Sequence, residues 1–152
     1  MNIVGLITEY NPFHNGHLYH IQEAKRVTGA DAAVVIMSGN FVQRGTPAIM
    51  PKHLRVKAAL LSGADLVLEL PVCFATGSAE FFSMGSVALL DSLGCIDSIC
   101  FGSECGDSKT LGKIARILAE EPGDYKNVLQ DALRKGVSFP QARQTEIGRA
   151  HV

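Results

Sequence analysis

The sequence has few cysteines, almost no net charge and no long apolar run, and each shortage excludes a class of protein. Its four cysteines form no CxxC pair and have no histidine at zinc-finger spacing, and a chain of 152 residues needs no disulfide bonds to hold its core. We therefore expect reduced thiols in a cytoplasmic protein. Asp65 and Glu69 interrupt the longest apolar stretch well short of a membrane span, and Glu9 follows the apolar start too soon for a signal peptide. The sequence predicts no membrane contact.

The near-zero net charge argues against general binding to nucleic acid. A formal net charge of −1 gives no general attraction to nucleic acid, so any RNA contact would need a local basic patch. The remaining composition, 47% hydrophobic and 19% charged, is typical of one soluble domain with a real core.

Short apolar runs alternate with segments of helical periodicity along the chain. The runs lack the polar alternation of a half-exposed sheet, so we expect parallel strands covered by helices on both faces. The expected strands are 3–7, 32–37, 66–71 and 98–101, and the expected helices are 17–27, 52–61, 78–93, 109–120 and 125–135. This pattern predicts an α/β fold with a parallel sheet of about four strands.

The turn between the first strand and the first helix carries the strongest signal, TEYNPFHNGH from Thr8 to His17. Pro12 keeps the chain extended after the strand, and Gly16 lets the backbone approach a bulky ligand. His14 and His17 lie three residues apart at the helix start, where their imidazoles share one face beside the positive end of the helix dipole. The turn therefore predicts a phosphate site at the carboxyl edge of the sheet.

Four blocks of sequence resemble one known family. His14-Asn15-Gly16-His17 resembles the HxGH signature of the nucleotidyltransferases related to class I aminoacyl-tRNA synthetases. The wider string from Gly5 to Leu18 resembles the tRNA(Met) cytidine acetate ligase family, in which the same order of blocks is found. The other blocks are MSGNFVQRG at 37–45, ELP at 69–71 and FGSE at 101–104.

The resemblance implies a fold and a set of site residues. The fold is a Rossmann-like parallel sheet with helices on both faces, and the catalytic residues are His14 and His17, which stabilise the transferring phosphate of ATP with Mg²⁺ present. No residue is assigned as a metal ligand. The implied ATP-binding residues are Gly5, Leu6, Ile7, Thr8, Glu9, Tyr10, Asn11, Pro12, Phe13, His14, Asn15, Gly16, His17, Leu18 and Gly102.

The resemblance also implies an activity. An ATP-dependent ligase would activate acetate as acetyl-adenylate and acetylate N4 of the wobble cytidine of elongator tRNA(Met). Another HxGH adenylyl- or cytidylyltransferase that makes a nucleotide cofactor is an alternative, although such relatives tend to lack the run Glu9-Tyr10-Asn11. A fragment that binds ATP without catalysis is a further alternative.

Several polar residues outside the turn have uncertain roles in the sequence alone. Arg44 lies in an irregular stretch expected to be a loop over the pocket, where a guanidinium suits phosphate, but a lone loop arginine is as often solvated. Glu69 sits in an apolar strand, where a structural role is favoured over contact with a metal or hydrogen-bond donor. The helix at 52–61 is expected to bury its leucines and to expose a basic face made by Lys52, His53, Arg55 and Lys57.

The two ends of the chain are expected to differ in origin. Residues 1–145 should form a nucleotidyltransferase-like ATP-binding domain that is the N-terminal part of a longer protein. Residues 146–152 have no apolar stripe and contain Gly148, so we expect a non-native tail with few tertiary contacts.

Overall fold

The structure is a computed structural model that describes residues 1–103, 106–139 and 141–142. The chain divides into two compact units, Met1–Gly102 and 103–152. The predictions for Glu104, for Cys105 and for the tail at 146–152 lie outside the described residues. No helix in the described part of the chain is long and apolar enough to cross a bilayer.

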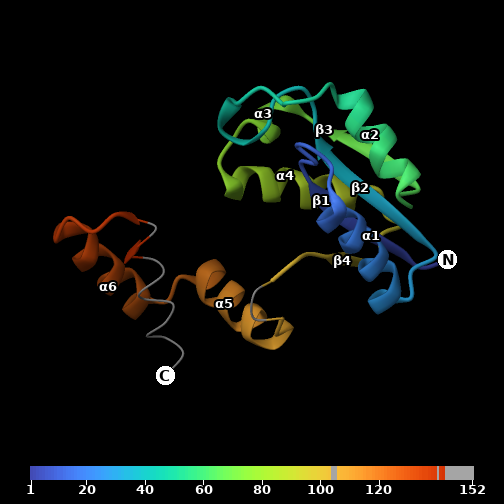
Figure 1. Cartoon of the computed structure of the whole chain (residues 1–152). Helices are drawn as coiled ribbons and strands as arrows, with labels where there is room; N and C mark the ends of the chain where they lie inside the picture. The colour runs from blue at the N-terminus through green and yellow to red at the C-terminus, as the bar shows by residue number, and fades with distance from the viewer. Residues whose placement is uncertain (104–105, 140, 143–152) are drawn as a thin grey trace. The chain divides into compact units, whose positions relative to one another are not determined.

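The elements follow one another in βα order through the first unit (Figure 1). They are β1 (Ile3–Thr8), α1 (Asn15–Thr28), β2 (Ala32–Ser38), the short 3-10 helix η1 (Gln43–Gly45), α2 (Lys52–Leu61), β3 (Leu66–Leu70), α3 (Val72–Ala75), α4 (Ala79–Ser92) and β4 (Ser98–Cys100). The second unit contains α5 (Ser108–Glu120) and α6 (Gly123–Arg134).

The strands of the first unit form a parallel sheet in the order β3-β2-β1-β4. Leu6 of β1 is in register with Val35 of β2 on one side and with Cys100 of β4 on the other. The chain therefore moves outward from β1 through β2 to β3 and then returns to the far side of β1. This reversal makes a topological switch point between β1 and β4, where ligands bind in open α/β sheets.

Helices cover both faces of this sheet, as the apolar strands predict. On one face, Ile21 and Ala24 of α1 and Ala59 of α2 pack with Leu6 and Val35. On the other face, residues of α3 and α4 pack on the opposite side chains of the same strands, among them Ala75, Phe82, Leu90, Ile36 and Leu70. The predicted α/β fold class is confirmed.

Aspartates bind the strands together at the amino edge of the sheet. Asp31, Asp65 and Asp97 each come directly before a strand and accept a hydrogen bond from a backbone N–H of a neighbouring strand or its lead-in. The N–H donors are those of Asn2 at 2.7 Å, Ala33 at 2.8 Å and Ile3 at 2.8 Å, respectively. The Lys25 ammonium, 2.6 Å from Asp65, holds the pKa of that carboxyl below its usual value.

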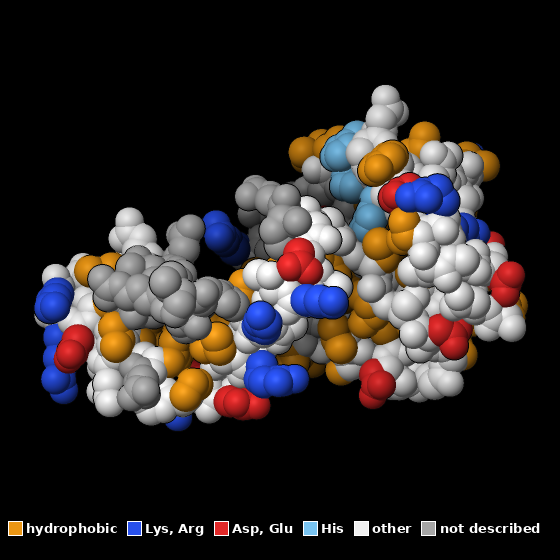
Figure 2. Space-filling view, turned by 90° about the horizontal axis from the view of Figure 1, so that it is seen from below, with side chains coloured by type: hydrophobic (Ala, Val, Ile, Leu, Met, Phe, Trp, Pro, Cys, Tyr) orange, Lys and Arg blue, Asp and Glu red, His pale blue; other side chains and the backbone are white. Residues whose placement is uncertain are grey.

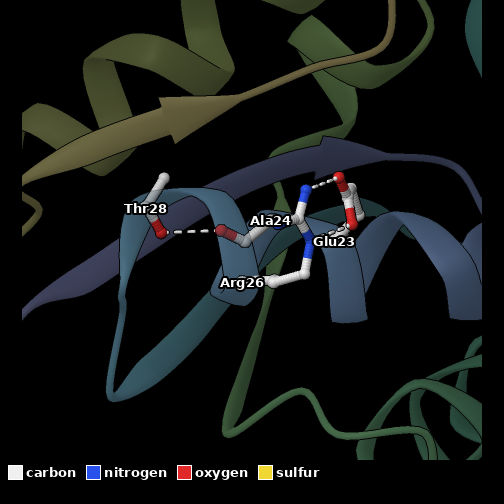
Figure 3. A network of polar contacts seen from close by, with 4 residues as sticks. All are labelled: Glu23, Ala24, Arg26 and Thr28. Carbon is white, nitrogen blue, oxygen red and sulfur yellow. Dashed lines mark hydrogen bonds and ion pairs between the residues drawn. The ribbon is translucent and has the colours of Figure 1, made fainter.

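The far end of α1 is stabilised by contacts within the helix (Figure 3). The Arg26 guanidinium donates to Glu23 through Nε at 2.7 Å and Nη2 at 2.5 Å, and the Thr28 hydroxyl donates to the Ala24 carbonyl at 2.6 Å. Gly29 then ends the helix at φ 63°, as its position in the sequence predicts. This network is remote from the turn at His14 and has a local structural role.

Two predicted faces are wrong. In α2 the buried residues are Arg55 and Ala59, while Leu54 and Leu61 are 50% and 80% exposed. In α4 the sequence favours Phe81, Phe82 and Met84 as core residues, but only Phe82 is buried and Met84 lies at the surface.

The second unit is helical in its described part. Asp107 caps α5 by accepting from the Lys109 N–H at 2.9 Å, and is one of the two residues, with Ser108, that the sequence offers for this cap. The helical spacing of α5 predicts Leu111, Ile114, Ala115 and Leu118 on its inner face; Leu111, Ile114 and Leu118 are half-buried, and Ala115 is exposed.

Candidate functional site

The turn between β1 and α1 lies at the switch point of the sheet. It follows Thr8, the last residue of β1, and Gly102 follows β4, the parallel neighbour of β1. His14, His17 and Gly102 therefore follow two adjacent strands at the carboxyl edge of the sheet. A Cβ at Gly102 would meet nothing within 4 Å, so the backbone there is open to a flat ligand.

The two histidines form the N-terminal cap of α1. His14 is the N-cap residue, and its Nδ1 accepts from the Gly16 N–H at 3.1 Å. His17 reaches back, and its Nδ1 accepts from the His14 N–H at 3.3 Å. Each Nδ1 is an acceptor, so each neutral imidazole carries its proton on Nε2. The cap thus presents two Nε2–H donors at the positive end of the helix dipole.

The His14 and His17 rings are stacked, with centroids 3.8 Å apart and planes 25° from parallel. Burial lowers the pKa of His17, and repulsion from His14 and His20 lowers it further. At neutral pH the His17 ring is therefore an uncharged donor. An anionic ligand at Nε2 would favour the imidazolium, so charge can develop on this ring as it develops on the ligand.

Aromatic residues of the turn hold His17 in place. Tyr10 is fully buried at φ 50°, and its ring meets His17 edge to face at a centroid distance of 4.8 Å. Phe13 lies 4.8 Å from Tyr10 and 5.6 Å from His17, and the Asn11–Pro12 bond between them is cis. Burial raises the pKa of Tyr10 to about 12, with Thr8 acting in the opposite direction, so its hydroxyl stays neutral.

Gly16 has a second reason to lack a side chain. A Cβ at this position would lie 3.0 Å from Cε1 and 3.1 Å from Nδ1 of His14. The glycine that the sequence predicts for ligand approach is therefore also needed for the histidine cap.

Arg55 is the largest fully buried side chain and joins the ends of two strands. Its Nη1 donates to the Glu9 carbonyl at 2.6 Å, its Nε donates to the Met50 carbonyl at 3.2 Å, and its Nη2 donates to the Gly39 carbonyl. Burial lowers the pKa of Arg55, while Glu9 and Glu69 raise it. The prediction that Arg55 belongs to an exposed basic face is wrong, because three converging backbone carbonyls draw the guanidinium inward.

The loop after β2 is fastened to the turn after β1. Glu9 Oε1 accepts from the Gln43 N–H at 2.8 Å, and Asn11 Oδ1 accepts from the Ile49 N–H at 2.7 Å. With Arg55, these bonds fix the Glu9–Tyr10 peptide and, through Tyr10, the orientation of His17.

The remaining predicted ATP-binding residues fall into three groups by burial. Gly5, Leu6 and Thr8 are buried in β1, and a Cβ at Gly5 would lie 2.8 Å from Leu90. Ile7, Phe13 and Leu18 are half-buried, and Pro12, Asn15 and Gly16 are exposed. The buried group can shape the site only through the strand, whereas the exposed group borders solvent at the edge.

Arg44 and Glu69 occupy different positions at the same edge. Arg44 is exposed in η1 at φ 63°, and its backbone N–H donates to the Gly77 carbonyl at 3.3 Å. Glu69 forms an ion pair with Lys52 at 2.5 Å, and its side chain is 48% exposed. A Cβ at Gly39 would lie 2.1 Å from Glu69 Oε1, so the carboxylate rests against the Gly39 backbone.

His20 was not predicted, although it continues the three-residue spacing of His14 and His17. Its Nε2 is buried without a hydrogen-bond partner among the described residues. Burial lowers the pKa of His20, and the Cys100 backbone partly offsets this by raising it. Figure 2 shows histidine side chains gathered at one place on the surface of the first unit, with hydrophobic side chains beside them. The repeated spacing was the signal that could have identified His20.

The described residues contain no group of three or more His, Cys, Asp or Glu side chains placed to hold a metal ion. A Mg²⁺ ion at such an edge would be held chiefly by nucleotide phosphates and water, which is its usual coordination in nucleotide sites.

Comparison with known proteins gives consistent matches. A family model described as HIGH Nucleotidyl Transferase matches residues 1–151. The tRNA(Met) cytidine acetate ligase of Acetivibrio thermocellus is 56% identical over 147 residues, covering 97% of this chain and 35% of the relative. The Clostridium novyi protein of the same name is 58% identical over 94% of this chain and 36% of the relative.

Solved structures agree with the sequence matches. Thermotoga maritima TmcAL bound with alpha-thio ATP has a TM-score of 0.92 and 47% identity, covering 99% of this chain and 36% of that chain. Its apo form has a TM-score of 0.93. The chain spans about a third of the length of the relatives that it matches.

Proposed function

This chain belongs to the HIGH nucleotidyl transferase family, and from that premise we propose that it is the ATP-binding part of a tRNA(Met) cytidine acetate ligase. The observation that carries the proposal is an identity of 56% along 97% of the chain to a relative of that name. The histidine cap at the switch point agrees with it, because it offers imidazole N–H donors where a nucleotide would bind.

The proposed reaction has two steps. An acetate oxygen attacks the α-phosphorus of ATP, the bond to the β-phosphate oxygen breaks, and pyrophosphate leaves. The acetyl group of the resulting acetyl-adenylate then passes to N4 of the wobble cytidine of elongator tRNA(Met), and AMP leaves. The first step needs no protein nucleophile, only preorganised donors around the phosphorus.

His14 and His17 supply those donors in the proposal. Their Nε2–H groups bind the phosphate oxygens, while the turn at Glu9–Phe13 and Gly102 border the rest of the nucleotide. Mg²⁺ enters with ATP and neutralises phosphate charge. The low pKa of His17 suits this role, since its imidazole can gain positive character only as the phosphate becomes more negative.

The extent and setting of the domain are also proposals. We infer that the ATP-binding part includes residues 1–145. Contacts to tRNA belong mainly to the two thirds of the relatives that this chain does not match. Such an enzyme would act in the cytoplasm, where its tRNA substrate is found.

Exchange of labelled pyrophosphate into ATP tests the first step in a full-length protein containing this chain. Acetate should stimulate exchange, and phosphorylated cofactor precursors should not. Stimulation by such a precursor would favour a nucleotide-cofactor transferase. ATP binding by calorimetry without any exchange would favour a non-catalytic nucleotide-binding protein.

A further inference from the structure

A small cavity opens at the ends of β2 and β3, beside the turn that carries the histidines. Its volume is about 170 Å³, and Gly39, Asn40, Phe41, Glu69, Leu70 and Val72 line it. Sites for drug-sized ligands occupy roughly 300–1,000 Å³, so this cavity suits a single planar ring rather than a whole nucleotide. Most of its lining comes from the blocks at 37–45 and 69–71, which the ATP site does not use.

The chemistry of the lining is specific. Phe41 is 47% exposed, so a planar ring can stack on its face. Asn40 is exposed and offers both amide donors and an acceptor, whereas Glu69 offers only acceptor oxygens. The cavity therefore combines a stacking surface, a donor and an anionic acceptor.

The loop that carries Asn40 and Phe41 is fixed by its own backbone. The Ala48 N–H donates to the Asn40 carbonyl at 2.9 Å, and the Val42 N–H donates to the Thr46 carbonyl at 2.9 Å. Phe41 also forms an antiparallel bridge with Pro47. The stacking surface is thus preorganised instead of being assembled on binding.

The Glu69 carboxylate is held over the end of β2. Lys52 binds Oε2 at 2.5 Å, and Oε1 rests against Gly39, where any Cβ would collide with it. Since β2 is the neighbour of β1, one strand spacing of about 4.8 Å separates this end from that of β1. Glu69 itself belongs to β3, two strands from β1, and its carboxylate reaches back over the end of β2 on the side of the histidine cap.

We propose that this cavity binds the acceptor cytosine of the RNA and that Glu69 is the base for acetyl transfer, an inference that rests on the proposed function. Phe41 stacks on the ring, Asn40 donates to N3 or O2, and Glu69 accepts from the N4 amine, the pairing that acidic residues make with cytosine. Uracil presents O4 instead of an amine, so the carboxylate repels it.

The chemical step balances with the groups named. The N4 lone pair forms a bond to the acetyl carbonyl carbon, and the bond from that carbon to the phosphate oxygen breaks. AMP leaves with the bonding electrons. The proton of N4, which becomes acidic as the N–C bond forms, passes to the Glu69 carboxylate and then to solvent.

Separate assays of the two half-reactions test this role in a full-length protein containing this chain. Glu69→Gln should leave acetate-dependent pyrophosphate exchange within about twofold and slow acetyl transfer to tRNA by roughly a hundredfold, as for loss of a general base. Glu69→Asp, which keeps the carboxylate, should recover part of the transfer rate. Phe41→Ala should weaken binding of an anticodon stem-loop roughly tenfold, as for loss of one stacked base, and Phe41→Tyr should not.

Matched controls separate this site from general damage. Asp91→Asn removes an exposed carboxylate, and Phe81→Ala removes a phenylalanine that is 55% exposed, both outside the cavity. Neither should alter transfer or stem-loop binding. Replacing the acceptor cytidine of the stem-loop by uridine should weaken binding to the wild type more than to Glu69→Gln.

The possible failures are distinguishable. Normal transfer by Glu69→Gln, or an equal loss of exchange and transfer in that variant, would overturn the acceptor site, while acetate-dependent exchange by the wild type would still support the proposed function. Absence of acetate-dependent exchange in the wild type would overturn the proposed function and, with it, this inference. Melting temperatures within a few degrees of the wild type would show that the variants are folded, because an exposed ion pair contributes roughly 0–1 kcal/mol.

Discussion

At the amino edge of the sheet, Asp31, Asp65 and Asp97 use their charge on backbone N–H groups, whereas at the carboxyl edge the histidine cap keeps two Nε2–H groups for solvent or ligand. At the amino edge the carboxylates are hydrogen-bonded to backbone and fix the strands. At the carboxyl edge two imidazole N–H groups remain available for a ligand, and the buried Arg55 keeps the turn in place. The amino edge of the sheet therefore serves chiefly stability, and the carboxyl edge offers groups for ligand chemistry.

The largest expected effect comes from removing Arg55, which, like the aspartates at the amino edge, uses its charge on backbone groups. Arg55→Met leaves three backbone carbonyls without their donors, at about 1–3 kcal/mol each, so we expect a loss of about 4 kcal/mol in the free energy of unfolding. Urea unfolding followed by circular dichroism measures it.

Arg55→Lys is the partner variant, because it keeps the charge but cannot reach all three carbonyls. It should remain folded while lowering kcat for pyrophosphate exchange more than it raises the KM for ATP, since Tyr10 and His17 are then less well oriented. Unchanged exchange in a folded Arg55→Lys protein would limit Arg55 to a stabilising role.

His17→Ala tests ligand chemistry at the carboxyl edge. We expect adenylate formation in the full-length protein to slow by roughly a hundredfold or more, as for loss of one preorganised donor. ATP affinity should fall much less, because the contact strengthens as charge develops on the phosphate. Equal losses in affinity and turnover would reduce His17 to a ground-state anchor.

Asp97→Asn is the matching test at the amino edge. The amide oxygen can still accept from the Ile3 N–H, but the charge is lost, so the free energy of unfolding should fall by about 1 kcal/mol. Pyrophosphate exchange should stay at the wild-type rate. A loss of exchange in this variant would show that the two edges are coupled.

The smallest expected effect is that the two edges lose their contributions to stability at different pH values. Burial holds the folded-state pKa values of His17 and His20 below 6.5, so the folded protein favours the neutral form of both rings. The stability that this preference provides is fully present above pH 6.5 and is lost as the pH falls through the folded-state pKa values. The pKa of Asp65 is below 3.8, so its contribution persists until pH falls below that value. Melting temperatures from pH 8 to 3 should fall in two stages, and His20→Gln should reduce only the first.

The sequence predicted features that depend on neighbouring residues and missed contacts between residues far apart in the chain. The order of the four strands and the longer helices and the stop at Gly29 follow from neighbouring residues, and the cap of α5 was narrowed to Asp107 or Ser108, whereas the short helix α3 was not predicted. The start of α1 was predicted two residues late, because histidine is not among the usual cap residues. The cap itself needs the ring orientations that only the structure gives.

Arg55 shows why the rest could not be predicted. Arginine is seldom buried, and its helix offered leucines that were better candidates for the core. Its burial depends on carbonyls at Glu9, Gly39 and Met50, which come together only after the strands pair. The cavity at Glu69 has the same origin, because its lining comes from two separated blocks of sequence.

The histidine cap has a consequence for the order of folding. Its hydrogen bonds join residues no more than three apart, so it can form with the first turn of α1, on the submicrosecond scale of helix formation. The bonds of Arg55 to Glu9 and Gly39 close loops of 46 and 16 residues and must wait for the sheet. The nascent chain can therefore carry the histidine cap before the sheet has formed, and the bonds of the Arg55 guanidinium to the turn follow.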